Sequence, residues 1–200
     1  MEGLKDELLT RWFGDDPDDA AAGEKQAGLW WGQSAETDKM LSTDFGRAAS
    51  AAAAGSLDHW TGSPRGRLAL ILLLDQLPRV IHRGTPGAFA CDERALRIAE
   101  EGLASGADRR LRPIERVFFY LPFEHSEEPA DQLKSVGLFE ALADDVDEAW
   151  REHFGGYVDF AVRHKEIIDR FGRFPHRNVI LGRESTPDEI EFLKQPGSGF

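Results

Sequence analysis

The sequence predicts an all-α fold, in which about eight helices pack as antiparallel pairs in a bundle or a stack. Apolar residues recur at helical spacing in most segments, and no stretch shows the sustained alternation that is typical of half-buried strands. Hydrophobic residues make up 41% of the 200-residue chain, including thirteen Phe and five Trp, which is enough to bury a core. No linker divides the chain, so we expect one domain over residues 1–200, with residues 1–40 the least regular part.

The first half of the chain carries three clear helix patterns. Apolar residues at helical spacing predict a first helix that stops before Gly14, and residues 15–23 (DDPDDAAAG) have the composition of a loop. A second helix is expected from Met40 to Ala54. Residues 64–77 begin with a proline and are apolar on nearly every side, which is typical of a buried central helix. A parallel strand is the alternative there, but Leu and Ala dominate over Val, which favours a helix.

The second half repeats this pattern of proline starts and glycine stops. Helices are expected over residues 85–106, 113–121, 129–142 and 150–168, and Pro122 should end or kink the second of these. The last start signal, in residues 186–193 (TPDEIEFL), combines a threonine cap with a glutamate three residues later, as in a capping box.

The charge of the chain excludes one class of partner and suggests another. A formal net charge of −12 makes it a poor binder of a nucleic-acid backbone, which requires clustered Lys and Arg. The acidity is uneven, because residues 121–150 hold nine acids and one lysine, whereas residues 163–183 hold six cations and two acids. Such asymmetry indicates either an anion site in the basic part or two faces of the fold that pair with each other.

The sequence also predicts the compartment. Cys91 is the single cysteine, so no internal disulfide can form. The first residues, MEGLKDELLTRWFG, lack the apolar core of a signal peptide, and the longest apolar run, residues 68–74, is too short to span a bilayer. We therefore expect a cytoplasmic protein with no membrane partner.

A first polar cluster follows the buried run of the central helix. Asp75 and Arg79 are four residues apart and can pair on one helical face, with Gln76, His82 and Arg83 close by. These side chains are candidate ligand-binding groups. The alternative is a buried ion pair at a helix end.

A second polar cluster follows Pro122. It consists of Glu124, His125, Ser126 and Glu127. His125 and Glu127 are residue types that serve as acid/base groups or metal ligands. The alternative is that Ser126 or Glu127 caps the helix that begins near residue 129.

The third cluster is an aromatic and basic loop, residues 171–178 (FGRFPHRN), after a helix that carries His164. Arg173 and Arg177 could form paired hydrogen bonds to a carboxylate or phosphate, and His164 and His176 could join the site, with Asn178 as a further candidate ligand-binding residue of the loop. The alternative is that the phenylalanines enter the core while the arginines bond helix carboxylates. The chain contains no C-x-x-C, H-E-x-x-H, G-x-G-x-x-G or Walker motif, so we predict no metal site and name no cofactor.

Four segments of the chain together resemble the bacterial family called domain of unknown function 924. They are LALILLLDQLPR, RGTPGAFACD, YLPFEHSE with a following DQ, and HKEIIDRFGRFPHRN with LGRESTPDE. The resemblance runs from about Phe45 to Leu193 and implies a tetratricopeptide-like helical fold. Val80 departs from the family pattern, which usually has Asn after the arginine of D-Q-x-P-R. The resemblance implies no activity, substrate or cofactor.

Three functions fit these residues. The first is a helical module that binds a peptide or a small anionic ligand through Asp75, Arg79, Arg83, Arg173, Arg177 and Asn178. The second is a metal-assisted or acid/base hydrolase that uses His125, Glu127, His164 and His176. The third is a buried polar network that clamps the helices and has no ligand. The first two require the three clusters to meet in space.

Overall fold

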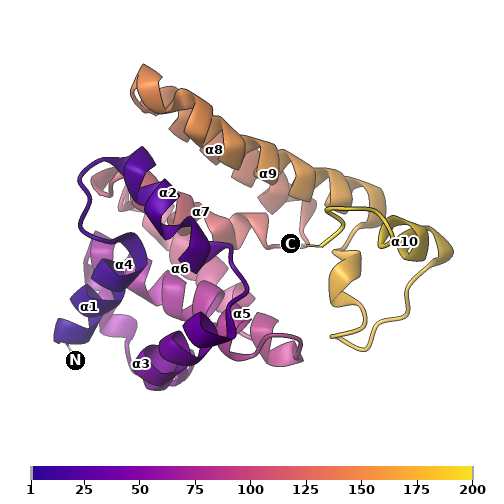
Figure 1. Cartoon of the computed structure of the whole chain (residues 1–200), viewed down its shortest axis with the longest axis horizontal. Coiled ribbons are helices and arrows are strands. Elements are labelled where there is room, and N and C mark those ends of the chain that lie inside the picture. Colours follow the sequence, from indigo (N-terminus) through magenta and orange to yellow (C-terminus); the bar gives the residue numbers. More distant parts are fainter. Residues whose placement is uncertain (1, 200) are drawn as a thin grey trace.

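The computed structural model describes residues 2–199, and these residues form helices and turns without a β-strand (Figure 1). The α-helices are α1 (Glu2–Phe13), α2 (Asp19–Trp30), α3 (Ala35–Ala53), α4 (Pro64–Ile71), α5 (Leu77–Ile81), α6 (Asp92–Ala104), α7 (Pro113–Glu124), α8 (Pro129–Asp145), α9 (Arg151–Phe171) and α10 (Pro187–Phe192). Short 3-10 segments are η1 (Asp58–Gly62), η3 (Pro86–Phe89), η4 (Asp108–Arg110), η5 (Glu148–Trp150) and η6 (Pro175–Arg177). The fold class predicted from the sequence is therefore confirmed.

The predicted central helix forms, but it is interrupted by a π-turn. α4 and α5 join through a π-helical segment, η2 (Leu72–Gln76), in which the amide of Leu77 bonds to the carbonyl of Leu72, five residues back. Pro78 follows directly and has no N–H to continue a regular ladder, which accounts for the irregular turn. Side chains 68–75 are 0% exposed, so this helix forms the centre of the molecule.

The other helices pack around the central helix in pairs. α1, α6 and α7 contact α4, and α3 packs against α5. α8 and α9 form the most extensive contact between two helices, and Figure 1 shows them side by side as a long arm across the bundle. Because η5 is the only element between them, they run antiparallel. This arrangement of neighbouring helix pairs is consistent with tetratricopeptide-like packing.

The apolar core has two parts. The main cluster runs from α1 to α9 and includes Trp12, Phe45, Phe118 and Phe154, each almost completely buried. A second, small cluster consists of Ile167, Ile168 and Phe174, with Phe171 and Phe192 packed against it. The second cluster holds the C-terminal segment, residues 172–199, against the end of α9. No helix within residues 2–199 is both long and apolar enough to cross a membrane.

Three details differ from the sequence-based expectation. The region expected to be a loop over residues 15–23 becomes helical at Asp19, because Asp18 accepts a bond from the amide of Ala21 and caps α2. The start at Pro86 produces a 3-10 turn, and α6 begins only at Asp92. α7 continues two residues past Pro122 and ends at Glu124, so this proline lies in the last turn of the helix and does not end it.

Candidate ligand site

The three polar clusters of the sequence meet where α5, α6 and α7 approach the C-terminal segment. We call Asp75, Arg79, Asp92, His125 and Arg177 the central polar cluster. Asp75 belongs to the π-turn, Arg79 to α5, Asp92 to the first turn of α6, His125 to the end of α7 and Arg177 to η6. Their side chains form a continuous chain of contacts. The three clusters therefore meet in space, as the binding-module and hydrolase hypotheses both require.

Asp75 is the most deeply buried acid of this cluster, with 0% exposure. Its Oδ1 lies 2.8 Å from Nδ1 of His125 and 3.3 Å from Nη1 of Arg79, and its Oδ2 accepts a hydrogen bond from Gln76 at 2.6 Å. Burial alone would raise the pKa of Asp75, but Arg79 and His125 outweigh it and hold that pKa below its usual range. Asp75 is therefore an ionised carboxylate inside the protein.

His125 is neutral in this setting. Burial and the nearby Arg79 charge lower its pKa, although Asp75 acts in the opposite direction. Because ionised Asp75 can only accept, Nδ1 of His125 is the donor and the proton-free Nε2 is an acceptor. The side chain of His125 is 14% exposed, so the ring is the part of this pair that solvent or a ligand can reach.

Two arginines share the carboxylate of Asp92. Arg79 binds it through two hydrogen bonds of 2.9 and 3.0 Å, whereas Nη1 of Arg177 lies 3.6 Å away. The Arg177 guanidinium lies between the rings of Phe89 and Phe174, 4.7 and 4.5 Å from their centroids. Arg177 is only 6% exposed, and its Nε has no hydrogen-bond partner among the described residues. Burial, reinforced by the Arg79 charge, lowers its pKa to about 10.

A second buried pair lies beside the cluster. Oε1 of Glu124 is 3.3 Å from Nδ1 of His164, which also bonds to the carbonyl of Phe160 at 2.8 Å. Burial, with a smaller contribution from the charge of Asp75, raises the pKa of Glu124 to about 8. Burial lowers the pKa of His164 to about 3. Glu124 thus holds a proton at neutral pH, while His164 is neutral.

Glu127 has a different role from the one expected of an acid/base group. Its carboxylate receives two hydrogen bonds from Arg183, at 2.7 and 2.9 Å, and a third from the backbone amide of Phe174 at 2.8 Å. Arg183 also donates to the carbonyl of Phe174 and to Oδ1 of Asn178. Glu127 therefore ties the C-terminal segment to the turn between α7 and α8.

The remaining candidates of the third cluster bond within the C-terminal segment. Arg173 forms two hydrogen bonds to Glu189, at 2.7 and 2.9 Å, and Asn178 donates to the same carboxylate at 3.2 Å. His176 lies next to Phe174, with ring centroids 5.7 Å apart, and burial together with Arg177 lowers its pKa to about 4. These contacts match the alternative in which the loop arginines bond helix carboxylates.

Other sequence candidates lie outside the cluster. Arg83 is on the surface and pairs with Asp38 of α3 through bonds of 3.1 and 3.0 Å. His82 is exposed. Ser126 donates to Asp131 and accepts a hydrogen bond from the amide of Glu128, whereas the N-cap residue of α8 is Glu128 and no side chain caps this helix.

Sequence reasoning missed two members of the site. Asp92 and Phe89 lie in residues 85–106, where the sequence predicts one long helix, and neither is among the predicted site residues. One signal was present, because an acid in the first turn of a helix, following an aromatic residue, can meet arginines from neighbouring elements. Gln132 was also missed, although its amide donates to the carbonyls of Glu124 and Ser126 and holds the end of α7 in place.

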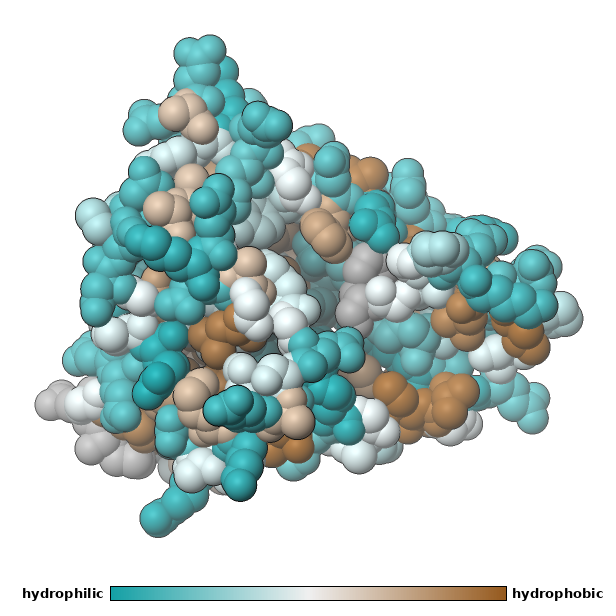
Figure 2. All heavy atoms as spheres, viewed as in Figure 1, coloured by the Kyte–Doolittle hydropathy of each residue, from teal (hydrophilic) through white to brown (hydrophobic). Residues whose placement is uncertain are grey.

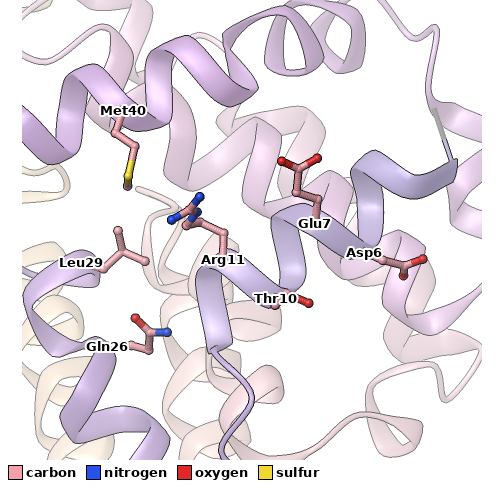
Figure 3. Close-up of a pocket in the computed structure, with 7 residues that line it drawn as sticks. All are labelled: Asp6, Glu7, Thr10, Arg11, Gln26, Leu29 and Met40. Carbon is pink, nitrogen blue, oxygen red and sulfur yellow. The ribbon is translucent and has the colours of Figure 1, made fainter.

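The surface of the molecule is hollowed. The space-filling view shows a recess at the centre of the face, between the N-terminal helices and the C-terminal segment (Figure 2). A separate cavity of about 660 Å³ opens between α1, α2 and α3, where Arg11 projects between Leu29 and Met40 (Figure 3). That cavity contains no residue of the central polar cluster.

The histidines and carboxylates of the described residues are not arranged as a metal site. Within residues 2–199, no group of three or more His, Cys, Asp or Glu side chains is arranged so that it could hold a metal ion. Asp75 is engaged by His125, Gln76 and Arg79, and Glu127 is engaged by Arg183.

Comparison with known proteins identifies the family. The sequence model of the family described as "Bacterial protein of unknown function (DUF924)" matches residues 8–197. The chain belongs to the DUF924 family. A solved structure, that of the protein of unknown function ATU0120 from Agrobacterium tumefaciens, is similar to it with 36% sequence identity and a TM-score of 0.80. The match covers 98% of this chain and 99% of that one, and a comparison with curated proteins gives no match.

The residues that match the DUF924 model include the candidate ligand site. The DUF924 match spans every residue of the central polar cluster and the whole second and third polar clusters. Val80, the departure from the DUF924 pattern noted above, lies on α5 beside Arg79 and packs against the main core.

Proposed function

We propose that this DUF924 protein binds a small oxyanion, either a carboxylate or a phosphate group, at the central polar cluster. A carboxylate could belong to a small molecule or to the C-terminus of a peptide. The observation that carries the proposal is Arg177, whose buried guanidinium has an unpartnered Nε and only a long contact of 3.6 Å to Asp92. We further propose that the protein acts in the reducing cytoplasm, since Cys91 is its single cysteine.

A buried cation with incomplete hydrogen bonding is costly. Removing a charge from water costs several kcal/mol unless its hydrogen bonds are replaced, and here Asp92 is already engaged by both nitrogens of Arg79. The faces of the Phe89 and Phe174 rings attract the cation through cation–π interactions, but they accept no strong hydrogen bond. An oxyanion would supply the missing acceptor, and a guanidinium is well suited to grip two of its oxygens.

The groups around Arg177 determine what else the ligand would contact. His125 offers a proton-free Nε2 on a partly exposed ring. Arg79 is 20% exposed at its side chain and adds positive charge on the same side. The negative charges of Asp75 and Asp92 equal the positive charges of Arg79 and Arg177. The cluster therefore favours a ligand with a single oxyanion group over a highly charged ligand.

Isothermal titration calorimetry at low ionic strength tests the proposal with inorganic phosphate and with N-acetylalanine, which carries one free carboxylate. We expect a dissociation constant of about 1 mM for at least one of them, as is typical of small ligands with few atoms. N-acetylalanine amide, which lacks the charge, should not bind. The difference between phosphate and N-acetylalanine tells which oxyanion the site prefers.

Two variants make the test specific. Arg177→Met removes the cation but keeps an unbranched apolar chain close in length to the aliphatic part of arginine, and it should abolish binding of the probe. Arg97→Met removes an exposed arginine of α6 and should leave binding unchanged. Equal binding to wild type and Arg177→Met, or no binding of either probe to wild type, would contradict the proposal.

Acid/base chemistry on the bound ligand is the second candidate function. The observation that favours it is the 2.8 Å bond from His125 to ionised Asp75, because a buried carboxylate that orients a neutral imidazole is the usual arrangement around a general base. Of the four residues first considered for hydrolysis, His125 is the one that belongs to the central polar cluster. A hydrolytic activity lost in His125→Asn, with phosphate binding retained, would support this second candidate.

A further inference from the structure

The proposed oxyanion site is built from two parts of the chain. Arg177 and Phe174 belong to the C-terminal segment, residues 172–199, whereas Asp92, Phe89 and His125 belong to the helical bundle. Arg177 is 6% exposed and Phe174 is 0% exposed. A ligand can therefore reach the buried edge of the Arg177 guanidinium only if the C-terminal segment moves.

The C-terminal segment has few apolar contacts with the main core. Phe174 belongs to the small cluster with Ile167 and Ile168 of α9, and Phe192 packs against this same cluster. Among residues 162–199, none is a buried member of the main core cluster. Segments with few buried apolar contacts to the rest of a protein open locally at a lower free energy than the core.

The segment is coherent within itself. Arg173 and Asn178 both bond to Glu189, and Arg183 bonds to Asn178. These bonds connect the loop to α10 and would survive a movement of the whole segment. Gly172, where the segment leaves α9, has a φ of 68°, a conformation that glycine adopts without strain, and a Cβ there would meet nothing within 4 Å. Gly172 is therefore a suitable hinge.

Glu127 makes three of the hydrogen bonds that fasten this segment to the rest of the fold, in addition to the Arg177–Asp92 contact and the bond from Arg163 to the carbonyl of Gly197. The Glu127 carboxylate accepts hydrogen bonds from the backbone amide of Phe174 and from Nη1 and Nη2 of Arg183. Burial acts to raise the pKa of Glu127, but the bonds from Arg183 and from the Phe174 amide outweigh it, and the pKa lies below its usual value. Glu127 is thus charged at neutral pH and makes three charge-assisted bonds, which are the stronger kind.

We propose that residues 172–199 form a lid that hinges at Gly172, with Glu127 as its latch. When the lid opens, the oxyanion enters the central polar cluster. When the lid closes, it brings Arg177 onto the ligand, so that binding favours the closed state. This inference rests on the proposed function for the identity of the ligand, but the opening itself is a property of the ligand-free protein.

Hydrogen exchange of single amides, followed by NMR on the full chain, tests the lid. The amide of Phe174 reports opening, because its acceptor is Glu127, and the amide of Leu77, within the buried central helix, reports global unfolding. In wild type, we expect Phe174 to exchange much faster than Leu77. In Glu127→Gln, Phe174 should exchange about tenfold faster still, because the latch loses its charge, while Leu77 is unchanged.

Glu128→Gln is the matched control, since Glu128 is the next residue and its exposed side chain caps nothing. It should leave both amides unchanged. Inorganic phosphate should slow exchange at Phe174 in wild type and have no effect in Arg177→Met. Equal exchange of Phe174 and Leu77 in wild type would overturn the lid, because the segment would then open only with the whole fold.

The lid and the proposed function fail in different ways. In one outcome, the Phe174 amide exchanges through local opening and responds to Glu127→Gln, but phosphate and N-acetylalanine give no heat of binding. The proposed oxyanion site is then contradicted, whereas the proposed latch is supported. If phosphate binds by calorimetry but leaves the exchange of Phe174 unchanged, the site stands and the lid does not gate it.

Discussion

His125 donates a hydrogen bond from Nδ1 to Oδ1 of Asp75 over 2.8 Å, and this bond joins α7 to the π-turn of the central helix. Asp75 has no exposed surface and is ionised, so its charge is compensated inside the protein by Arg79 and by the dipoles of His125 and Gln76. The other groups of the cluster are arranged around this compensated charge. Its removal is therefore the most direct test of how the cluster contributes to stability.

Asp75→Asn should lower the free energy of unfolding by about 3 kcal/mol, because Arg79 and His125 lose a buried partner. Urea denaturation followed by circular dichroism measures this change. Asp38→Asn removes the partner of Arg83 on the surface and should cost less than about 1 kcal/mol. Similar losses in the two variants would show that the Asp75 charge is not central to the fold.

Glu124 should make the protein less stable as pH rises from about 4.5 to about 8. Its pKa is about 8 in the folded state, against 4.5 for an ordinary glutamate, so the folded protein keeps a proton that the unfolded chain loses. Glu124→Gln should remove this part of the pH dependence and raise the free energy of unfolding at pH 8 by about 3 kcal/mol. Urea denaturation at several pH values measures the slope, and parallel slopes for variant and wild type would refute the assignment.

His164 should have the opposite effect at lower pH. Its pKa is about 3 in the folded state, against 6.5 for an ordinary histidine, so the unfolded chain takes up a proton first as the solution is acidified. Neutral His164 makes its full contribution to the free energy of unfolding above pH 6.5, and this contribution is lost as the pH falls from 6.5 to about 3. His164→Gln should flatten the stability curve in that window, whatever its effect at neutral pH, and an unchanged slope would contradict the prediction.

Arg79 and Arg177 should differ in their contribution to stability, although both contact Asp92. Arg79→Met leaves Asp75 and Asp92 without their main cation and should cost about 3–5 kcal/mol. Arg177→Met leaves Asp92 bound by Arg79 and removes an incompletely bonded buried charge, so the change should stay within about 1 kcal/mol. A large loss in Arg177→Met would assign Arg177 to the structural network rather than to a ligand.

Two helical glycines provide a test of packing. A Cβ at Gly102 would lie 2.4 Å from Phe119 and 2.5 Å from Arg67, so Gly102→Ala should cost about 1–3 kcal/mol by crowding α4, α6 and α7. A Cβ at Gly137 of α8 would meet nothing within 4 Å, so Gly137→Ala should gain about 0.5–1 kcal/mol from helix propensity. Thermal melts compare the two, and equal melting temperatures would contradict the close packing at Gly102.

Most of the fold could be predicted from local sequence signals. The capping box at Thr186 and Glu189, the proline starts at Pro64, Pro113 and Pro129, and the stop at Gly14 all form as expected. These signals depend on contacts within a few residues, which a sequence displays directly. The start of α2 was missed because one aspartate cap outweighs the loop-like composition around it.

The candidate site was predictable only in part. The sequence showed three polar clusters and that His125 and Arg177 belonged to them, because polar side chains next to apolar runs must find partners. It could not show which partners they find. Asp92 joins Arg79 and Arg177 only through the packing of α6 on the central helix, and Glu127 meets Arg183 across 56 positions of the chain. Such pairings depend on tertiary packing, which leaves no periodic trace in the sequence.

The π-turn at Leu72–Gln76 gives the central helix one residue more than a regular helix of the same rise would contain. Deleting one residue within the π-turn would restore regular winding and leave the two flanking helices on the faces they now occupy. Deleting one residue of α4 outside the π-turn would instead rotate one side of the central helix by about 100°, the angle between successive residues of an α-helix. After that second deletion, either Leu68–Leu70 would leave the core or Asp75 and Arg79 would turn away from α6 and α7. The geometry of the candidate site is thus encoded as a length, the number of residues between two parts of one helix, as well as in the side chains that line it.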